Sequence, residues 1–91
     1  MKKKIYPDPY LLIVAMEECG ELIQACSKIY RYGNEKQHKK LLSEEIGDVL
    51  AMISLLIEEG YIDLEIAEKK KIAREKKHRS CLLYTSPSPR D

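Results

Sequence analysis

Two pairs of acidic residues, each spaced three apart, are the side chains of this protein best placed to do chemistry. Glu18 and Glu21 form the first pair, and Glu45 and Asp48 form the second. Residues three apart in a helix share one face, so the two carboxylates of a pair lie close together and repel each other. Apolar residues flank both pairs, where an uncompensated carboxylate is costly to desolvate. We therefore predict that a hard divalent cation such as Mg²⁺, which prefers oxygen ligands, gathers all four carboxylates.

Each acidic pair also encloses a glycine, Gly20 in the first and Gly47 in the second. Glycine inside a helix costs about 1 kcal/mol of helix stability relative to alanine. We expect the missing side chains either to let helices approach closely or to leave room for a ligand. Such a conflict with local preference is typical of functional sites.

Helical periodicity predicts that the pairs lie on two consecutive helices. Asp8-Pro9 is a cap residue followed by a first-turn proline, and Gly33-Asn34 is a stop signal, so the first helix runs between them. The second helix begins near Glu35 or a few residues later and ends at Gly60. Its latter half, residues 49–57, is apolar nearly all round, which is typical of a helix buried on several sides.

A third, strongly basic helix is predicted from a cap at Asp63 to about Arg79. The Ser- and Pro-rich stretch 81–91 breaks this pattern and matches the translation of an adaptor used in sequencing libraries. We expect the natural sequence to be truncated near Ser80. On this interpretation residues 1–80 form one helical domain, and 81–91 are a disordered, non-native tail.

The composition allows one small domain with a thin core. The chain has 91 residues and contains neither Phe nor Trp, and below about 80 residues a single core rarely suffices without disulfides, metal or partners. Cys19 and Cys26 lie about 10 Å apart along one helix, too far for a disulfide, and we interpret them as small buried apolar residues. We therefore predict an all-α fold whose three helices per chain form a four-helix-bundle-like core, completed by dimerisation.

Charge and hydropathy argue against several classes of partner. The net charge of +1 gives no indication of nucleic-acid binding. The basic start at residues 1–4 is followed by an apolar run that is too short and too acidic for export, and no segment is long enough to span a membrane. Reduced cysteines fit a cytoplasmic protein.

Taken together, the two acidic clusters resemble the signature of the MazG-like family. Glu17-Glu-Cys-Gly-Glu21 is followed, after a spacer of about two dozen residues, by Glu45-Ile-Gly-Asp48 and an apolar helix. Members of this family are all-α nucleoside triphosphate pyrophosphohydrolases related to dimeric dUTPases, and the chain is similar to small phage and bacterial members. The resemblance covers roughly residues 10–75. The spacer is short and Lys-rich, so it offers little with which to recognise a base.

The resemblance implies an enzyme that hydrolyses nucleoside triphosphates between the α- and β-phosphates, giving a monophosphate and pyrophosphate. Its cofactor would be Mg²⁺, for which Mn²⁺ can substitute, and the chain would form a homodimer or homotetramer. Glu17 would be a further ligand or the base that orients water. The Mg²⁺ ligands would be Glu18, Glu21, Glu45 and Asp48.

Four basic residues are candidates for binding the substrate's phosphates. Lys28 and Arg31 follow the first acidic pair by one to two helical turns, and Lys69 and Arg74 lie on the third helix. Arg31 is the preferred candidate because its planar fork suits phosphate oxygens.

Two other interpretations stay open. A di-iron four-helix protein needs E-x-x-H on two helices, and Glu35-x-x-His38 and Glu75-x-x-His78 have that spacing, although both lie among lysines at helix ends. A non-catalytic helical module would use the basic third helix for docking. In that case substitution of Glu18 by alanine would be neutral or stabilising.

Overall fold

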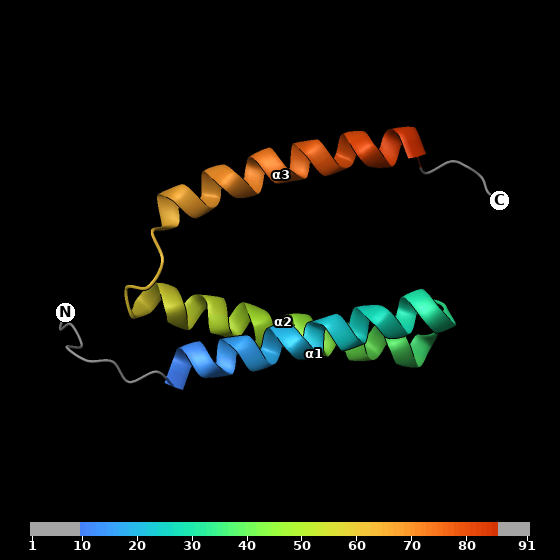
Figure 1. Ribbon diagram of the computed structural model, residues 1–91, viewed down its shortest axis with the longest axis horizontal. Coiled ribbons are helices and arrows are strands. Elements are labelled where there is room, and N and C mark those ends of the chain that lie inside the picture. Colours follow the sequence, from blue (N-terminus) through green and yellow to red (C-terminus); the bar gives the residue numbers. More distant parts are fainter. Residues whose placement is uncertain (1–9, 86–91) are drawn as a thin grey trace. The chain divides into compact units, whose positions relative to one another are not determined.

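The computed structural model describes residues 10–85, and the side-chain exposure of residues 10–82. It contains three helices, α1 (Tyr10–Tyr32), α2 (Lys36–Glu58) and α3 (Leu64–Thr85) (Figure 1). No strand occurs in the described part, so the predicted all-α class is confirmed. The predicted start signal Asp8-Pro9 lies outside the described residues. The chain divides after Tyr61 into two compact units, a hairpin of α1 and α2 and a second unit carrying α3, and each is considered by itself.

A glycine in the left-handed region ends each helix of the hairpin, as the sequence predicts. Gly33 has φ 97° and its N–H donates to the carbonyl oxygen of Ile29 at 2.8 Å, which satisfies one of the carbonyls left free at a helix end. Gly60, with φ 85°, follows α2, and its N–H donates to the Ile57 carbonyl at 3.1 Å. The short turn after Gly33 makes α1 and α2 antiparallel neighbours.

The helix α3 begins at its predicted cap and runs further than predicted. Asp63 Oδ1 accepts a hydrogen bond from the Ile66 N–H at 3.2 Å, the geometry of an N-cap. The helix continues past the expected end at Arg79 to Thr85. Residues 80–85 contain no glycine or proline, so nothing in the backbone stops the helix before the prolines that follow.

A regular seam joins α1 to α2. The less exposed residues of each helix recur at alternating spacings of four and three residues, which is the heptad spacing of coiled-coil packing. We call these positions the inner seam. They are Leu11, Ala15, Glu18, Leu22, Ala25 and Ile29 on α1, and His38, Leu42, Glu45, Val49, Met52 and Leu56 on α2.

The hairpin has little interior of its own. Among the described residues, the buried hydrophobic side chains are Ala25 and Met52, each 8% exposed, and no described side chain is fully buried. The inner seam also contains two carboxylates, Glu18 and Glu45. A core this small is less than a stable domain needs.

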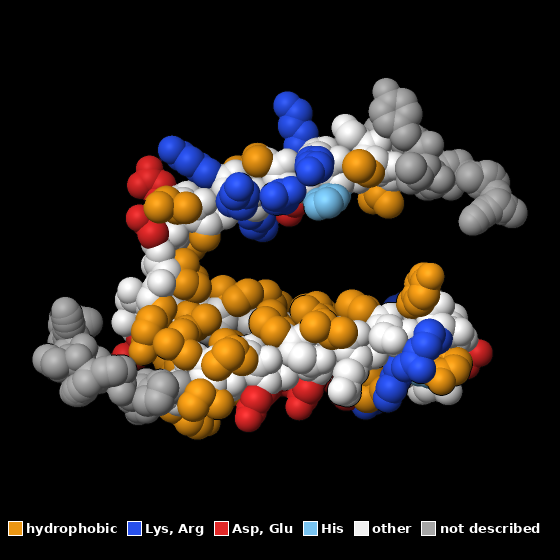
Figure 2. Space-filling model, in the orientation of Figure 1, with side chains coloured by type: hydrophobic (Ala, Val, Ile, Leu, Met, Phe, Trp, Pro, Cys, Tyr) orange, Lys and Arg blue, Asp and Glu red, His pale blue; other side chains and the backbone are white. Residues whose placement is uncertain are grey.

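A second apolar stripe lies one residue beyond the inner seam on both helices. Its members on α1 are exposed, with Met16 at 66% and Ile23 at 69%, and Leu50 on α2 is 57% exposed. Figure 2 shows hydrophobic side chains covering much of one face of the hairpin. Because right-handed helices that run antiparallel turn the residues after their seam to the same side, these positions form one apolar face. It consists of Leu12, Met16, Cys19, Ile23, Cys26 and Tyr30 on α1, and Ile46, Leu50, Ile53 and Ile57 on α2.

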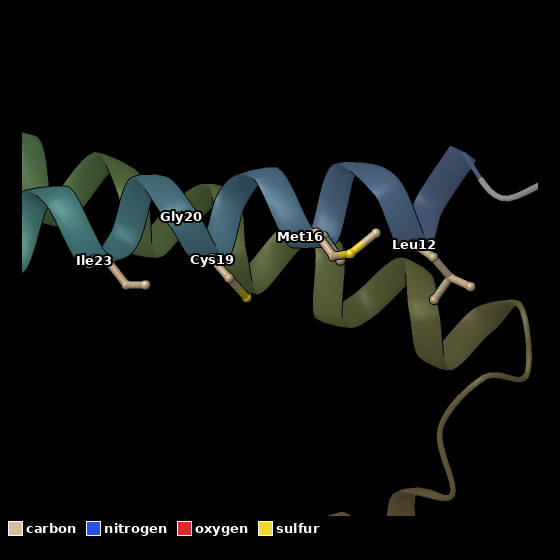
Figure 3. Close-up of a pocket in the computed structure, with 6 residues that line it drawn as sticks. Leu12, Met16, Cys19, Gly20 and Ile23 are labelled. Atoms are coloured by element: carbon tan, nitrogen blue, oxygen red, sulfur yellow. The ribbon is translucent and has the colours of Figure 1, made fainter.

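The two cysteines belong to this apolar face, so the prediction that they are buried is wrong for the single chain. Cys19 and Cys26 are both exposed, because each lies one position past the inner seam and points away from α2. An open hollow of about 610 Å³ runs along the same side of α1 (Figure 3). Its lining residues are Leu12, Ala15, Met16, Cys19, Gly20 and Ile23.

The two mid-helix glycines do not mediate the packing of α1 against α2. A Cβ atom added at Gly20 or Gly47 would meet no atom within 4 Å. The expectation that they let these two helices approach closely is therefore wrong for the hairpin. Gly20 instead leaves the apolar hollow open on α1.

Charged residues dominate α3. Lys71 Nζ lies 3.1 Å from Glu75 Oε2, and Arg79 Nη2 lies 3.9 Å from Glu75 Oε1, exposed pairs that contribute little to stability. Lys and Arg side chains are spread along the helix in Figure 2, while Ile66 and Ile72 are about two-thirds exposed. None of the three helices, over the residues described, is long and apolar enough to cross a membrane.

Substitution by alanine should change the free energy of unfolding in opposite directions at the helix-ending Gly33 and at the mid-helix Gly47. Gly33→Ala should lower the free energy of unfolding by about 1–2 kcal/mol, because an L-residue is strained at φ 97°. Gly47→Ala should raise it by up to about 1 kcal/mol, because the site is helical and open. Urea unfolding of the two variants checks both signs, and a loss of stability in Gly47→Ala would show that something packs on that position.

Candidate metal centre

The four carboxylates of the two acidic pairs converge between α1 and α2. One oxygen from each of Glu18, Glu21, Glu45 and Asp48 can be chosen so that all four lie within 4.8 Å of one another. The structure thus brings together the four residues that the sequence singled out, from two helices whose pairs are separated by the turn. Their role as metal ligands stays a prediction.

The inner seam positions one member of each pair. Glu45 occupies a seam position and is 8% exposed, and Glu18 occupies a seam position on α1 and is half-buried. Their partners Glu21 and Asp48 lie three residues further along, at the exposed edge. The site therefore reaches from the middle of the hairpin to solvent, which would allow a ligand to enter.

Electrostatics within the group is unfavourable without a cation. Glu18 Oε1 and Glu45 Oε2 are buried and have no hydrogen-bond partner. A proton on Glu45 would supply the missing donor, and the pKa of Glu45 is accordingly raised from 4.5 to about 7, first by the side-chain hydrogen bond that the protonated group makes with Glu18, then by burial, and then by repulsion from the charges of Glu18, Glu21 and Asp48. At neutral pH the metal-free site thus tends to hold a proton where a cation would fit.

The dimensions of the group suit a small divalent ion after a slight contraction. Oxygen ligands of one Mg²⁺ lie about 2.1 Å from it, so two of them are at most about 4.2 Å apart. The observed limit of 4.8 Å is a few tenths of an ångström larger, in the direction that mutual repulsion predicts. Glu45 is more than nine-tenths buried and has a carboxylate oxygen without a hydrogen-bond partner, and this observation favours a ligand here over a solvated acidic surface.

Other acidic residues of the two clusters lie outside this group. Glu17 is exposed on α1 next to Glu18. Glu44 is exposed and accepts a hydrogen bond from Lys40 one turn earlier on α2. Glu44 therefore lies outside the group of four carboxylates, whereas its neighbour Glu45 belongs to it.

A polar stripe runs along α1 on the other side of the inner seam from the apolar face. Its members as far as Lys28 each precede a seam residue by one position, and Arg31 continues the same spacings of four and three beyond the last seam residue. This stripe carries most of the sequence-predicted site residues of α1 on one side of the helix. Its members are Glu17, Glu21, Gln24, Lys28 and Arg31.

A small polar pocket of about 210 Å³ lies beside the carboxylates, between α1 and α2. Lys28 lines it, together with Gln24, which sequence analysis missed. The stripe spacing of Glu21, Gln24 and Lys28 could have identified Gln24 as a neighbour of the site. The complete lining is Glu21, Gln24, Ala25, Lys28, Leu41 and Glu45.

The other predicted phosphate ligands are not in this pocket. Arg31 Nε donates to Ser27 Oγ at 3.0 Å, and its guanidinium lies 5.0 Å from the ring centre of Tyr32, so it is engaged at the end of α1. Lys69 and Arg74 lie exposed on α3, in the second unit. For these three residues a role in substrate binding stays a prediction.

The histidines do not form a di-iron site in the described part of the chain. His38 stacks on Tyr32 with ring centroids 5.7 Å apart, and its Nδ1 lies 3.2 Å from the Gly33 carbonyl oxygen. His38 thus packs against the turn, and the group of possible metal ligands consists of carboxylates alone. The His78 side chain is exposed on α3.

The family model of the MazG nucleotide pyrophosphohydrolase domain matches residues 9–80. The match includes both acidic pairs and all of α1 and α2. The chain therefore belongs to the MazG nucleotide pyrophosphohydrolase family, which confirms the resemblance drawn from its motifs. Neither the comparison with curated proteins nor that with solved structures gave a match.

The raised pKa of Glu45 predicts how the metal-free protein responds to pH. Because the folded state holds this proton more tightly than the unfolded chain, stability should fall as pH rises from 4.5 to about 7. Saturating Mg²⁺ should oppose this fall, because it binds the ionised carboxylates of the folded state. Melting temperatures measured across this window, with chelator and with Mg²⁺, check both statements. If Glu45→Gln has the same pH profile as the wild type in chelator, Glu45 is not the group responsible.

Proposed function

We propose that this protein hydrolyses nucleoside triphosphates to a nucleoside monophosphate and pyrophosphate, with Mg²⁺ or, in its place, Mn²⁺. The observation that carries the proposal is the convergence of four carboxylates within 4.8 Å on two helices, in a chain of the MazG family. In the reaction the oxygen of a water bonds to the α-phosphorus. The bond from the α-phosphorus to the α–β bridging oxygen breaks, pyrophosphate leaves with that oxygen, and the proton of the water passes to solvent.

The carboxylates divide between holding the cation and orienting water. Glu18, Glu21, Glu45 and Asp48 would hold the cation, and the burial of Glu45 and partial burial of Glu18 would keep competing water away from part of its surface. When bound there, Mg²⁺ neutralises charge on the phosphate oxygens and lowers the pKa of bound water. Glu17 lies next to the group on the exposed polar stripe, where it would be a further ligand or would accept a hydrogen bond from the attacking water.

The triphosphate needs cationic partners besides the metal. Lys28 lines the pocket beside the carboxylates and is therefore the best supported of the four basic candidates. Arg31, at the end of the same polar stripe, and Lys69 and Arg74 on α3 would complete the phosphate site. The catalytic domain would be residues 1–80, and a nucleotide substrate together with exposed, reduced cysteines fits a cytoplasmic enzyme.

A second copy of the chain is the occupant we propose for the apolar face. The face repeats the heptad spacing of the inner seam one position along on both helices, and its listed members are uncharged, although Lys39 and Ser43 occupy the same spacing at the start of α2. A surface of that form is self-complementary, because two copies related by a two-fold axis present the same stripe to each other. Pairing of two hairpins would give a four-helix bundle and supply the core that one hairpin lacks. A homodimer, or a homotetramer built from it, is the assembly this predicts.

The assembly proposal predicts that Leu50→Glu dissociates the protein. A charge buried in the apolar face would cost several kcal/mol, which is about a hundredfold or more in the dissociation constant. Ser54→Glu is the matched control, because Ser54 is exposed on α2 outside both stripes. Sedimentation equilibrium measures the mass of each variant. A wild-type monomer at micromolar concentration, or an unchanged mass in Leu50→Glu, would contradict the proposal.

The enzymatic proposal predicts opposite behaviour for two neighbouring glutamates. Glu45→Ala should lower kcat/KM for pyrophosphate release by about a hundredfold or more, because a cation ligand contributes several kcal/mol to charge stabilisation. Its metal-free stability should not fall, since a repelled carboxylate is removed. Glu44→Ala should keep its activity, because Glu44 lies outside the group and pairs with Lys40.

The assay compares a panel of nucleoside triphosphates with Mg²⁺, with Mn²⁺ and with chelator. Metal-dependent release that is lost in Glu45→Ala and kept in Glu44→Ala establishes the activity and ranks the substrates. Equal activity of the two variants would contradict the proposal. If a folded, oligomeric wild-type protein released no pyrophosphate, a non-catalytic helical module would be favoured.

A further inference from the structure

Three basic residues of α3 form a row on one side of the helix. Successive residues of an α-helix are turned by about 100°, so Lys70, Arg74 and Lys77 fall within about 60° of one another. We call these three residues the basic row. All three are exposed, and none takes part in an ion pair among the described residues. Their charges are therefore available to an external anion.

The acidic residues of α3 lie on the other side of the helix. The same rotation per residue places all three of its glutamates within about 80° of one another and opposite the basic row. They are Glu65, Glu68 and Glu75. Glu75 lies 3.1 Å from Lys71 and 3.9 Å from Arg79, so the ion pairs of α3 also lie away from the basic row. Positive potential is thus concentrated on one side of α3, which the net charge of +1 for the whole chain conceals.

The distribution of apolar residues on α3 argues against a membrane or a protein as the partner of this row. A helix that lies on a lipid surface needs an apolar stripe, whereas Leu64 and Ile72 lie towards the acidic side and Ile66 lies next to the basic row. Protein interfaces depend on buried aromatic or apolar anchors and are depleted in Lys. The phosphate backbone of a nucleic acid requires only positive charge.

The residue types of α3 favour a duplex bound through its backbone. Residues 64–83 include no aromatic residue on which unpaired bases could stack, and no Asn or Gln with which to read adenine in a groove. The basic row extends over about 10.5 Å of the helix axis. One strand of B-DNA carries about three phosphates over that rise, at about 3.4 Å each. The row therefore matches a short run of phosphates in both length and charge.

We propose that the basic row of α3 binds the phosphate backbone of double-stranded nucleic acid without sequence specificity. Lys70, Arg74 and Lys77 each contact a phosphate, while the glutamates of α3 face solvent. The inference goes beyond the proposed hydrolysis of triphosphates and does not rest on it. Because Arg74 is also a candidate for binding the substrate's phosphates, the test leaves Arg74 unchanged.

The test is fluorescence anisotropy of a short labelled DNA duplex of mixed sequence, titrated with the full chain between about 50 and 200 mM salt. Three neutralised phosphates should give a slope of about −2.7 in log K against log salt. The double variant Lys70→Gln/Lys77→Gln should reduce that slope by about two and weaken binding by at least about tenfold at the lower salt concentration. A duplex of different sequence should bind equally well.

The matched control is the double variant Lys71→Gln/Arg79→Gln. It removes the same charge from two residues that pair with Glu75, and it should change the affinity for the duplex less than about threefold, because the lost charges lie off the row and are screened by salt. Glutamine has a helix propensity close to those of Lys and Arg, and circular dichroism verifies that α3 stays helical in both variants.

Each outcome decides for or against the basic row. If the wild type does not bind the duplex at the lower salt concentration, the inference is wrong. Equal weakening in the two double variants also overturns it, because only net charge would then matter. Displacement of the duplex by Mg²⁺-nucleoside triphosphate at the same phosphate concentration would assign the row to a single nucleotide, and binding to anionic lipid vesicles without binding to the duplex would assign it to a membrane. Duplex binding that depends on Lys70 and Lys77, in a protein that hydrolyses no triphosphate, supports the row and contradicts the enzymatic proposal.

Discussion

The rest of this molecule depends on the repulsion among four carboxylates, two of which lie in the inner seam and two at its exposed edge. Glu18 and Glu45 occupy positions that would otherwise pack apolar side chains, and one oxygen of each is buried without a partner. A hairpin with two buried hydrophobic side chains in its described part has little packing energy to offset this. A bound divalent cation would turn the same four groups from a source of repulsion into a cross-link between α1 and α2. Folding of the hairpin and binding of the metal are therefore expected to be coupled.

The heptad spacing of the inner seam places side chains of different kinds on different sides of each helix. On α1, successive residues supply a polar stripe, the inner seam and an apolar face, as Glu17, Glu18 and Cys19 illustrate at one level of the helix. The candidate metal ligands and the proposed self-association surface thus lie on opposite sides of the inner seam. If both proposals hold, a chain of 91 residues would expose its site to a nucleotide while a second copy covered its apolar side.

Much of the fold could be predicted because its signals are local. Gly33 ends α1 and Asp63 caps α3 as their residue types indicate, and the spacing of Glu18 with Glu21 and of Glu45 with Asp48 was enough to bring four carboxylates together once the turn was placed. Features that depend on how the two helices face each other were not predictable. Cys19 and Cys26 are exposed because they lie one position past the seam, and Gln24 lines a pocket completed by Leu41 of α2. The composition of one helix does not reveal which of its faces its neighbour covers.

The central claim, that the two acidic pairs hold one divalent-metal centre, is tested most directly by crystallography of the protein grown with Mn²⁺, using the anomalous signal to locate the metal. The account predicts an anomalous peak between α1 and α2, within bonding distance of carboxylate oxygens of Glu18, Glu21, Glu45 and Asp48, with these oxygens drawn closer than the 4.8 Å of the metal-free group. A structure in which Mn²⁺ binds elsewhere while these carboxylates stay protonated or pair with lysines would contradict it.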